Sequence, residues 1–427
     1  MTRTDRAPAP RWFVQGLIYA ALTSSIVSSL GMLLVPSVAT EFDVTVSTAQ
    51  WMLTINLLVG AVATPIMGRL ADGPHTRRLL LISLSVIFVG SLVAATAPNF
   101  AVFLLGRGLQ GLLYGTVPVT IALARRHLTY TQSQPAISTL SVTVSVGMGL
   151  GYPLTGILAA MFDLRAAFAF AAVFVATAAV AVWKLVPAGP DPLAPRVPFD
   201  VGGAALLGVG LAALLLWISE AQTWGWTSLT AILTLVVAVF SLINWAVHSV
   251  HTLHPLVNLR VIRTPEVLLA NATAIGLGTS MYIGLSIASL VAQAPSATGF
   301  GLAVPLMWAG FMMAPLSVGS LAANRAVRAL STRVDMAMFL PVGAAVMTVA
   351  SVLLWLSHSN FWTLAVGMFL FGVGIGSGYA AMPALIARSV AVEQLGSAVS
   401  FNQVLRTVGG AVGAAVSAAV LAAHPSE

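Results

Sequence analysis

The sequence predicts an all-α polytopic membrane protein with about thirteen transmembrane helices, arranged as two helical bundles plus two linker helices. Three observations predict this class. The 427 residues are 58% hydrophobic and 7% charged, with a mean hydropathy of +0.96, whereas soluble domains carry about 25% charged residues. Apolar runs of about 20 residues, long enough to cross a bilayer as a helix, recur along the chain. Basic residues fall in alternate loops.

The first apolar run follows three arginines near the N-terminus and continues to about residue 35. It is longer than the core of a signal peptide, and no small-residue cleavage site ends it, so we interpret it as an uncleaved membrane helix. Short turns rich in polar residues, Gly or Pro separate it from twelve further segments. The predicted segments are residues 12–36, 49–70, 78–97, 100–124, 136–160, 165–187, 201–220, 227–249, 267–292, 300–323, 336–357, 361–386 and 397–423.

The arginines predict the orientation, because cytoplasmic loops of membrane proteins are enriched in Lys and Arg. The N-terminal segment and every second loop after it carry basic residues, while the alternate loops carry almost none apart from Arg165. We therefore expect a multi-pass protein of the cell membrane (inner or plasma membrane) with a cytoplasmic N-terminus. The net charge of +7 does not indicate a nucleic-acid partner, since the basic residues are scattered among loops.

The chain contains an internal repeat, a feature of transporters built from two related bundles around a site at the membrane midplane. We expect an N-terminal six-helix bundle over residues 1–187, two linker helices over 188–262, and a C-terminal bundle over 263–427 with five helices. The repeat is clearest between predicted segments 5 and 13, where four pairs of small residues share one offset: Ala136/Ala398, Ser138/Ser400, Gly147/Gly409 and Gly151/Gly413.

A charged turn follows the second predicted segment. GRLADGPHTRRLLL, residues 68–81, places Asp72 close to Arg77 and Arg78 between two apolar runs. The related stretch GSLAANR at 319–325 has Ala323 in the position of Asp72. The acid is therefore a feature of one half of the repeat. The arginines either act together with Asp72 or simply fix the topology, and both interpretations stay open.

Arg107 lies inside the fourth predicted segment. An arginine within a membrane span costs about 2.5–3.5 kcal/mol on insertion scales, so it either faces the bundle interior or extends outward to the interface. In the next segment Gly147, Gly151 and Gly156 permit close approach of another helix, and Pro153 favours a bend. Packing explains these glycines as well as a role in gating does.

Taken in order, these motifs resemble the major facilitator superfamily, and more closely its fourteen-helix drug:proton antiporter branch. The family pattern G-x-L-A-D-R-x-G-R-[KR] resembles residues 68–78, and R-x-x-Q-G resembles residues 107–111. The antiporter motif G-x-x-x-G-P-x-x-G resembles residues 147–156, with Tyr152 inserted before Pro153. The resemblance covers the whole chain, although the last helix of that branch has no predicted counterpart.

The resemblance implies the major facilitator fold and transport by alternating access. It implies a conformational latch formed by Gly68, Asp72, Arg77 and Arg78, in which Asp72 pairs with the positive N-terminal end of a helix in the opposite bundle, near Gly396. It also implies that Arg107 takes part in proton coupling. We add Asp72 as a candidate for that role.

None of the twelve acidic residues falls near the middle of a predicted segment, and Thr23 stands where members of this branch commonly carry an acid. Neutral or anionic apolar substrates therefore suit the predicted cavity better than polycations do. We expect predicted segments 1, 4, 5, 9, 10 and 13 to line it. The candidate polar contacts are Asn56, Gln110, Tyr282, Asn402 and Arg406.

The predicted function is secondary active transport that exports amphipathic small molecules, as in multidrug or antibiotic efflux, in exchange for protons. Two alternatives are export of a lipid or glycolipid, and a non-transporting membrane sensor or assembly partner. We expect a monomer whose partners are a small amphipathic substrate, protons and membrane lipids. No cofactor, metal site or enzymatic activity is predicted, since no phosphate-binding loop or nucleophile–base set occurs. Three histidines at 248, 251 and 254 are interpreted as a solvated face.

Overall fold

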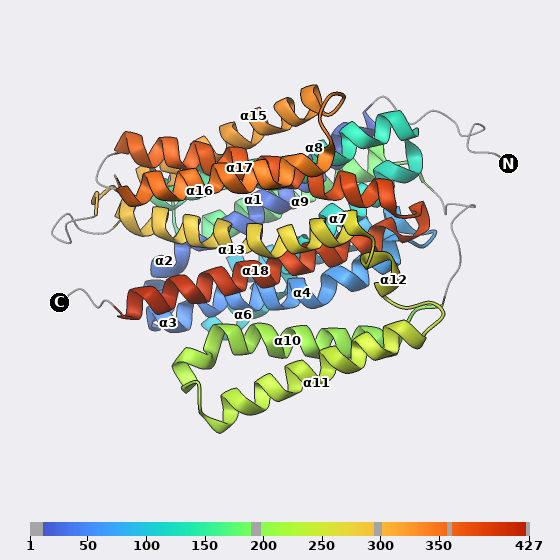
Figure 1. Cartoon of the computed structure of the whole chain (residues 1–427). Helices are drawn as coiled ribbons and strands as arrows, with labels where there is room; N and C mark the ends of the chain where they lie inside the picture. Colours follow the sequence, from blue (N-terminus) through green and yellow to red (C-terminus); the bar gives the residue numbers. More distant parts are fainter. Residues whose placement is uncertain (1–11, 189–197, 294–300, 357–360, 424–427) are drawn as a thin grey trace.

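The computed structural model describes residues 12–188, 198–293, 301–356 and 361–423, which are helical and contain no strand (Figure 1). Ten helices in these ranges are long and apolar enough to cross a membrane. The other three predicted segments correspond to α1 with α2, to α14 with α15, and to α18. Each predicted segment thus has a helical counterpart, which confirms the all-α polytopic class.

The first half of the chain forms six of the segments, two of them interrupted. The first is broken between α1 and α2, and the fourth is broken at Gly111 and Leu112, between α6 and α7. The helices are α1 (Phe13–Ser29), α2 (Val35–Glu41), α3 (Val46–Ala49), α4 (Trp51–Ala71), α5 (Thr76–Ala95), α6 (Phe100–Gln110), α7 (Leu113–His127), α8 (Tyr130–Met161) and α9 (Leu164–Leu185), with the 3-10 turn η2 (Met32–Leu34).

The rest of the chain forms a hairpin of two long helices and then five further segments. The hairpin is α10 (Val201–Trp224) and α11 (Leu229–His251). The helices after it are α12 (Leu259–Ile262), α13 (Pro265–Gln293), α14 (Leu306–Met312), α15 (Ala314–Leu330), α16 (Phe339–Leu356), α17 (Phe361–Ser389) and α18 (Leu395–Ala423), with the 3-10 turns η4 (Met336–Met338) and η5 (Val392–Gln394).

Helix α8 starts six residues before the predicted segment, at Tyr130 instead of residue 136. Thr129 caps it, because its hydroxyl accepts from the Gln132 amide while the Gln132 side chain accepts from the Thr129 amide. This reciprocal cap starts the helix ahead of Pro135, which the helix then accommodates. Pro153 also lies within the continuous helix.

The internal repeat is visible in the packing of the two halves. A Cβ placed on Gly147 or Gly151 would overlap α1, and a Cβ placed on Gly409 or Gly413 would overlap α13. Helix α8 therefore packs on the first helix of its half through the same two glycine positions by which α18 packs on α13. Gly147 and Gly151 of the antiporter motif thus pack within the first half. Neighbouring residues of α8, such as Gly149, contact the second half instead.

The α10–α11 hairpin lies along one side of the bundle, against α4 and α18 (Figure 1). Ala61 of α4, Leu215 of α10 and Ala411 of α18 form one buried cluster, so α10 contacts both halves. The outer side of α11 exposes large apolar side chains, including Phe240 at 67%. Such a surface is expected where lipid chains replace water.

Asp200 fixes the base of this hairpin. Its Oδ1 atom accepts from Gly203 N and lies 2.8 Å from His248 Nε2, and its Oδ2 atom accepts from Leu256 N. Burial works against ionisation, but these hydrogen bonds outweigh it and lower the pKa of Asp200. His248 pairs with an acid that is distant in sequence while its side chain stays 37% exposed, so the expected solvated face describes it only in part.

Candidate functional site

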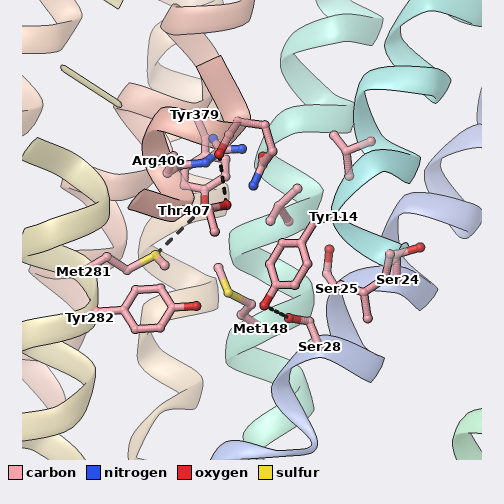
Figure 2. Close-up of a pocket in the computed structure, with 14 residues that line it drawn as sticks. Ser24, Ser25, Ser28, Tyr114, Met148, Met281, Tyr282, Tyr379, Arg406 and Thr407 are labelled. Carbon is pink, nitrogen blue, oxygen red and sulfur yellow. Dashed lines mark hydrogen bonds between the residues drawn. The ribbon is translucent and has the colours of Figure 1, made fainter. Parts of the chain in front are cut away.

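A pocket lies between the two halves of the molecule (Figure 2). One side comes from α1, α7 and α8, and the other from α13, α17 and α18. Its empty volume is about 520 Å³, which includes space that is open to solvent. The lining residues are Ser24, Ser25, Ser28, Leu113, Tyr114, Val117, Val144, Met148, Met281, Tyr282, Tyr379, Gln403, Arg406 and Thr407.

Polar side chains line the pocket from both halves. Figure 2 shows the α1 serines beside Tyr114 on one side, and Tyr282, Tyr379 and Arg406 on the other. The Tyr114 hydroxyl lies 3.3 Å from Ser28 Oγ, within the first half. Three of the six tyrosines in the chain are therefore gathered at one site, where each offers a ring face and a hydroxyl group.

Arg406 is the one charged residue in this lining, and it is 6% exposed. Its guanidinium carbon lies 4.0 Å from the centre of the Tyr379 ring, a cation–π contact. Within the described part of the chain it forms no ion pair, and its buried Nε has no hydrogen-bond partner. The structure thus holds a buried cation against an aromatic face at the wall of the pocket.

Arg107 has a different environment. It is 1% exposed and lies inside the first half, away from the pocket lining. Its Nε donates to Met52 O at 3.2 Å, its Nη1 donates to Gln110 Oε1 at 2.5 Å, and its carbonyl accepts from Asn56 Nδ2 at 2.9 Å. Of the two orientations expected from the sequence, the structure shows the interior one. No acid pairs with Arg107 among the described residues.

Two of the five expected cavity residues line the pocket, Tyr282 and Arg406. The other three are buried elsewhere. Asn56 and Gln110 support Arg107, and Gln110 also donates to Ser91 Oγ at 2.8 Å. Asn402 bonds Ala270 O and Asn271 Oδ1, both at 3.0 Å, and so joins α18 to α13. Buried amides of this kind satisfy helix-to-helix contacts and are not free to bind a ligand.

The set of helices around the pocket also differs from the expected set. Predicted segment 10, now α14 and α15, contributes no residue to this lining, and α17 contributes Tyr379 in its place. Helix α15 instead closes the boundary with α8, because Ser317 Oγ donates to Val146 O at 2.8 Å. Gly149 faces Ser317 at the same place, so this glycine, outside the motif, lies at the boundary between the halves.

A second contact between the halves lies at one end of the molecule, which we call the Asp72 rim: the turns at residues 72–75 and 128–129 and the start of α18 at 391–397. Asp72 is 3% exposed. Its Oδ1 atom accepts from Gly396 N at 2.8 Å, and its Oδ2 atom accepts from Ser397 N at 3.1 Å. The carboxyl group thus caps the N-terminus of α18 from the opposite half, at the position predicted from the sequence.

Two glycines allow the backbones to meet at this rim. A Cβ on Gly396 would lie 2.6 Å from Gly68 O and 2.7 Å from Asp72 Oδ1. A Cβ on Gly68 would lie 2.7 Å from Gly396 O and would overlap Ser400 Oγ. Real Cβ atoms do not approach other atoms this closely, so the contact requires glycine on both sides.

The arginine that supports Asp72 is Arg126, which the sequence analysis did not single out. Arg126 is 6% exposed, and its guanidinium donates to Gly73 O at 2.6 Å and to Asp72 O. Arg77 instead donates to Trp183 O at 2.5 Å, and Arg78 is exposed. Neither forms an ion pair with Asp72 among the described residues, so the arginine adjacent in sequence is not the one adjacent in space.

Burial raises the pKa of Asp72 to about 7 from its ordinary value of 3.8. Hydrogen bonds from Ser397 and Gly396 and the charge of Arg126 lower the pKa by less than burial raises it. This carboxyl group lies just beyond the end of α4, at the edge of the membrane-spanning region. Its charge therefore changes near neutral pH when the rim is closed.

Two helical halves that meet around a pocket and are joined at one rim define a membrane transporter of the two-bundle type. The sequence profile of the Major Facilitator Superfamily matches residues 16–414. This chain belongs to the Major Facilitator Superfamily. That assignment confirms the family recognised from the motifs.

Similar proteins agree with the family. The MFS-type transporter YhcA of Bacillus subtilis is 25% identical over 65% of this chain and 51% of its own length. The probable multidrug resistance protein EmrY of Escherichia coli is 22% identical over 96% of this chain and 81% of its own length. The chain spans about half the length of the first curated relatives that it matches.

A solved structure shows the same fold. The human organic anion transporter MFSD10 (TETRAN) superposes with a TM-score of 0.67 and 18% sequence identity, over 97% of this chain and 94% of that chain. At this identity the likeness concerns the arrangement of helices alone.

Proposed function

We propose that this protein is a secondary active transporter that exports amphipathic small molecules across the cell membrane by alternating access. The observation that carries the proposal is a pocket bounded by both halves, together with a rim contact between the halves at one end. Relative movement of the halves would then open the pocket toward that end. The multidrug resistance name of EmrY supports export of small molecules.

Asp72 is the proposed latch. Opening the rim removes the two amide hydrogen bonds that Asp72 accepts from α18 and separates Gly68 from Gly396. A hydrogen bond contributes about 0.5–1.5 kcal/mol net, and more when the carboxyl group is ionised, so two of them can bias a two-state equilibrium. Arg77 and Arg78, predicted as latch residues, act in this proposal on topology, while Arg126 holds the turn that carries Asp72.

We place the Asp72 rim on the cytoplasmic side, with the N-terminus. The arginines support this orientation, since Arg77, Arg78, Arg125 and Arg126 lie in or beside the two turns of the first half at this rim. A closed rim then corresponds to a pocket that is shut off from the cytoplasm.

Proton coupling is proposed for Asp72. When the rim opens, water reaches the carboxyl group, its pKa falls toward the ordinary value, and the proton leaves. Opening toward the cytoplasm is thereby linked to proton release on that side. The proton-coupling role implied for Arg107 stays a prediction, and its hydrogen bonds to Met52 and Gln110 support a structural role.

Transport by the purified full chain in lipid vesicles tests the proposal. A panel of fluorescent amphipathic probes is added and a pH gradient is imposed across the membrane. We expect at least one probe to move against its gradient, with proton movement in the opposite direction. Asp72→Asn should uncouple probe movement from the gradient, while Asp43→Asn, an exposed acid on a different turn, should not.

Three results would contradict parts of the proposal. Unchanged coupling in Asp72→Asn would reject the proton role. A protein that moves no probe but changes the distribution of vesicle lipids would indicate the lipid exporter instead. A protein that binds ligands and moves neither probes nor lipids would indicate the sensor or assembly partner.

A further inference from the structure

The charge of the pocket is carried by one residue. Of the fourteen side chains in the lining, none is acidic and Arg406 is the single cation. Its neighbours along the wall are neutral hydroxyl, amide, thioether and aliphatic groups. A ligand that enters the pocket therefore meets a net positive charge at one wall.

Arg406 also lacks the partner that a buried cation requires. Burying an unpaired charge is costly, and buried arginines are normally paired with carboxylates or carbonyl groups. The Tyr379 ring at 4.0 Å compensates only in part, since a cation–π contact is weaker than a hydrogen-bonded ion pair. The buried Nε has no hydrogen-bond partner, so at least one donor of the guanidinium is not used by the protein.

Arg107 serves as an internal reference for this argument. It is equally enclosed, yet it donates to Met52 O and Gln110 Oε1, so burial in this fold does not by itself leave an arginine without acceptors. The difference lies in position, because Arg406 is at the pocket wall and Arg107 is not. An acceptor for Arg406 would therefore come from the pocket.

We infer that the pocket binds an amphipathic organic monocarboxylate whose head group pairs with Arg406. This inference rests on the proposed transport function and names its substrate class. The planar guanidinium offers parallel donors that match both oxygens of a carboxylate. A single cation balances a single negative charge, which favours a monoanion over a dianion.

The remaining lining fits the body of such a molecule. Met148 and Met281 supply adaptable apolar surface, and the rings of Tyr114 and Tyr282 supply flat faces from opposite halves (Figure 2). An apolar body that suits such a lining is present in a bicyclic aromatic acid and in a medium-chain fatty acid. Both share the chemistry that Arg406 recognises, so the experiment includes one of each.

Calorimetric titration of the purified full chain in detergent tests the inference without requiring transport. The probes are 2-naphthoate, its neutral counterpart 2-naphthamide, the cationic 2-naphthylmethylammonium, and decanoate. We expect 2-naphthoate to bind at least tenfold more tightly than the amide and the ammonium. Decanoate binding tighter than 2-naphthoate would identify a fatty acid as the preferred source of the carboxylate, and the reverse would identify an aromatic acid.

Variants assign the preference to Arg406. Arg406→Gln should reduce the ratio of 2-naphthoate to 2-naphthamide affinity to about one, and Arg406→Lys should retain part of it. Arg328→Gln, which removes an exposed arginine of α15, should leave the ratio unchanged. Thermal melts without ligand check that each variant is folded.

Equal affinity for 2-naphthoate and 2-naphthamide in the unmodified protein, or an unchanged ratio in folded Arg406→Gln, would overturn the inference. These outcomes are distinct from failure of the proposed function. Movement of uncharged probes without any carboxylate preference would leave transport standing and remove the inference. Carboxylate binding through Arg406 without movement of any probe would leave the site standing and remove transport.

Discussion

Helices α8 and α18 occupy equivalent places in the two halves, and two differences between them bear on the pocket and on the rim. Both pack on the first helix of their half through paired glycines. Three residues before the first of these glycines, α8 has Val144 and α18 has Arg406, and both side chains line the pocket. The repeat therefore gives the two helices the same packing. The positive charge of the pocket comes from Arg406, a position where the two copies of the repeat have different residues.

The same two helices differ at their starts. Thr129 and Gln132 cap α8 from within the same half. Gly396 and Ser397 of α18 receive their cap from Asp72, in the opposite half. The counterpart of Asp72 in the second half is Ala323, which has no carboxyl group that could cap α8. A helix that depends on the other half for its cap can report whether the halves are in contact.

The largest expected effect is a difference in thermal stability between substitutions of the two buried arginines, Arg107 and Arg406. Arg107→Met removes the donor to the buried Gln110 Oε1, at about 1–3 kcal/mol, and the side-chain bond to Met52 O, so the thermal midpoint in detergent should fall by several degrees. Arg406→Met removes a buried charge without a hydrogen-bonded partner and should leave the midpoint unchanged or raise it. The opposite order of midpoints would contradict the distinction between them.

The next effect concerns the cap that Asp72 of the opposite half provides to α18. In Gly396→Ala the new Cβ would lie 2.7 Å from Asp72 Oδ1, so the two hydrogen bonds, each contributing about 0.5–1.5 kcal/mol net and more when the carboxyl group is ionised, cannot both persist, and the open fraction of the rim should rise at least tenfold. The chain has no cysteine, so spin labels on His75→Cys and Glu393→Cys, both exposed, can report the rim distance directly.

A matched glycine provides the control for that measurement. Gly276 of α13 has open space where a Cβ would be placed, so Gly276→Ala should leave the label distances as in the parent. An unchanged distance distribution in Gly396→Ala would show that the rim contact does not hold the halves together.

A smaller effect is expected from pH. The closed rim raises the pKa of Asp72 to about 7, whereas an open, hydrated carboxyl group has a pKa near 3.8. The closed state therefore binds the proton more tightly and is favoured at low pH, and this advantage is lost as the pH rises through 7. Between pH 6 and pH 8 the ratio of open to closed rim should increase about tenfold. In Asp72→Asn the label distances should not respond over this interval.

The smallest effect is expected at the self-capped helix. Thr129→Ala removes the side-chain cap of α8 and should lower stability by about 1 kcal/mol. Although Thr129 belongs to a turn of the rim, its cap bonds only Gln132 of the same half, so the rim distance should stay unchanged. A rim that opens in Thr129→Ala would mean that the two helix starts do not differ in the way described.

Much of this architecture could be predicted from the sequence, because the cost of burying charge in lipid confines the charged residues to turns and helix ends. The thirteen segments and the small-residue repeat follow from hydropathy and spacing, whereas the position of Asp72 opposite Gly396 was implied by the resemblance to the family. Segment starts were less certain, as for α8, where the cap at Thr129 outweighed the proline at 135.

The pocket was harder to predict, since a helix in a membrane is apolar on its lipid face and on its packed face alike, and hydropathy does not distinguish them. Asn56, Gln110 and Asn402 were expected in the cavity because they are polar, yet they bond backbone and side-chain groups inside one half. Tyr379 and Arg126 were missed because their partners are distant in the sequence.

The α10–α11 hairpin has a mechanical consequence. Helix α10 packs against both α4 and α18, the helices that belong to opposite halves. Leu215 of α10 lies in one buried cluster with Ala61 of α4 and Ala411 of α18. Any rocking that parts α4 from α18 must therefore shear at least one of these two apolar seams. In the proposed transport cycle the hairpin spans the boundary that moves, so the lipid around the exposed apolar face of α11 would have to rearrange with it.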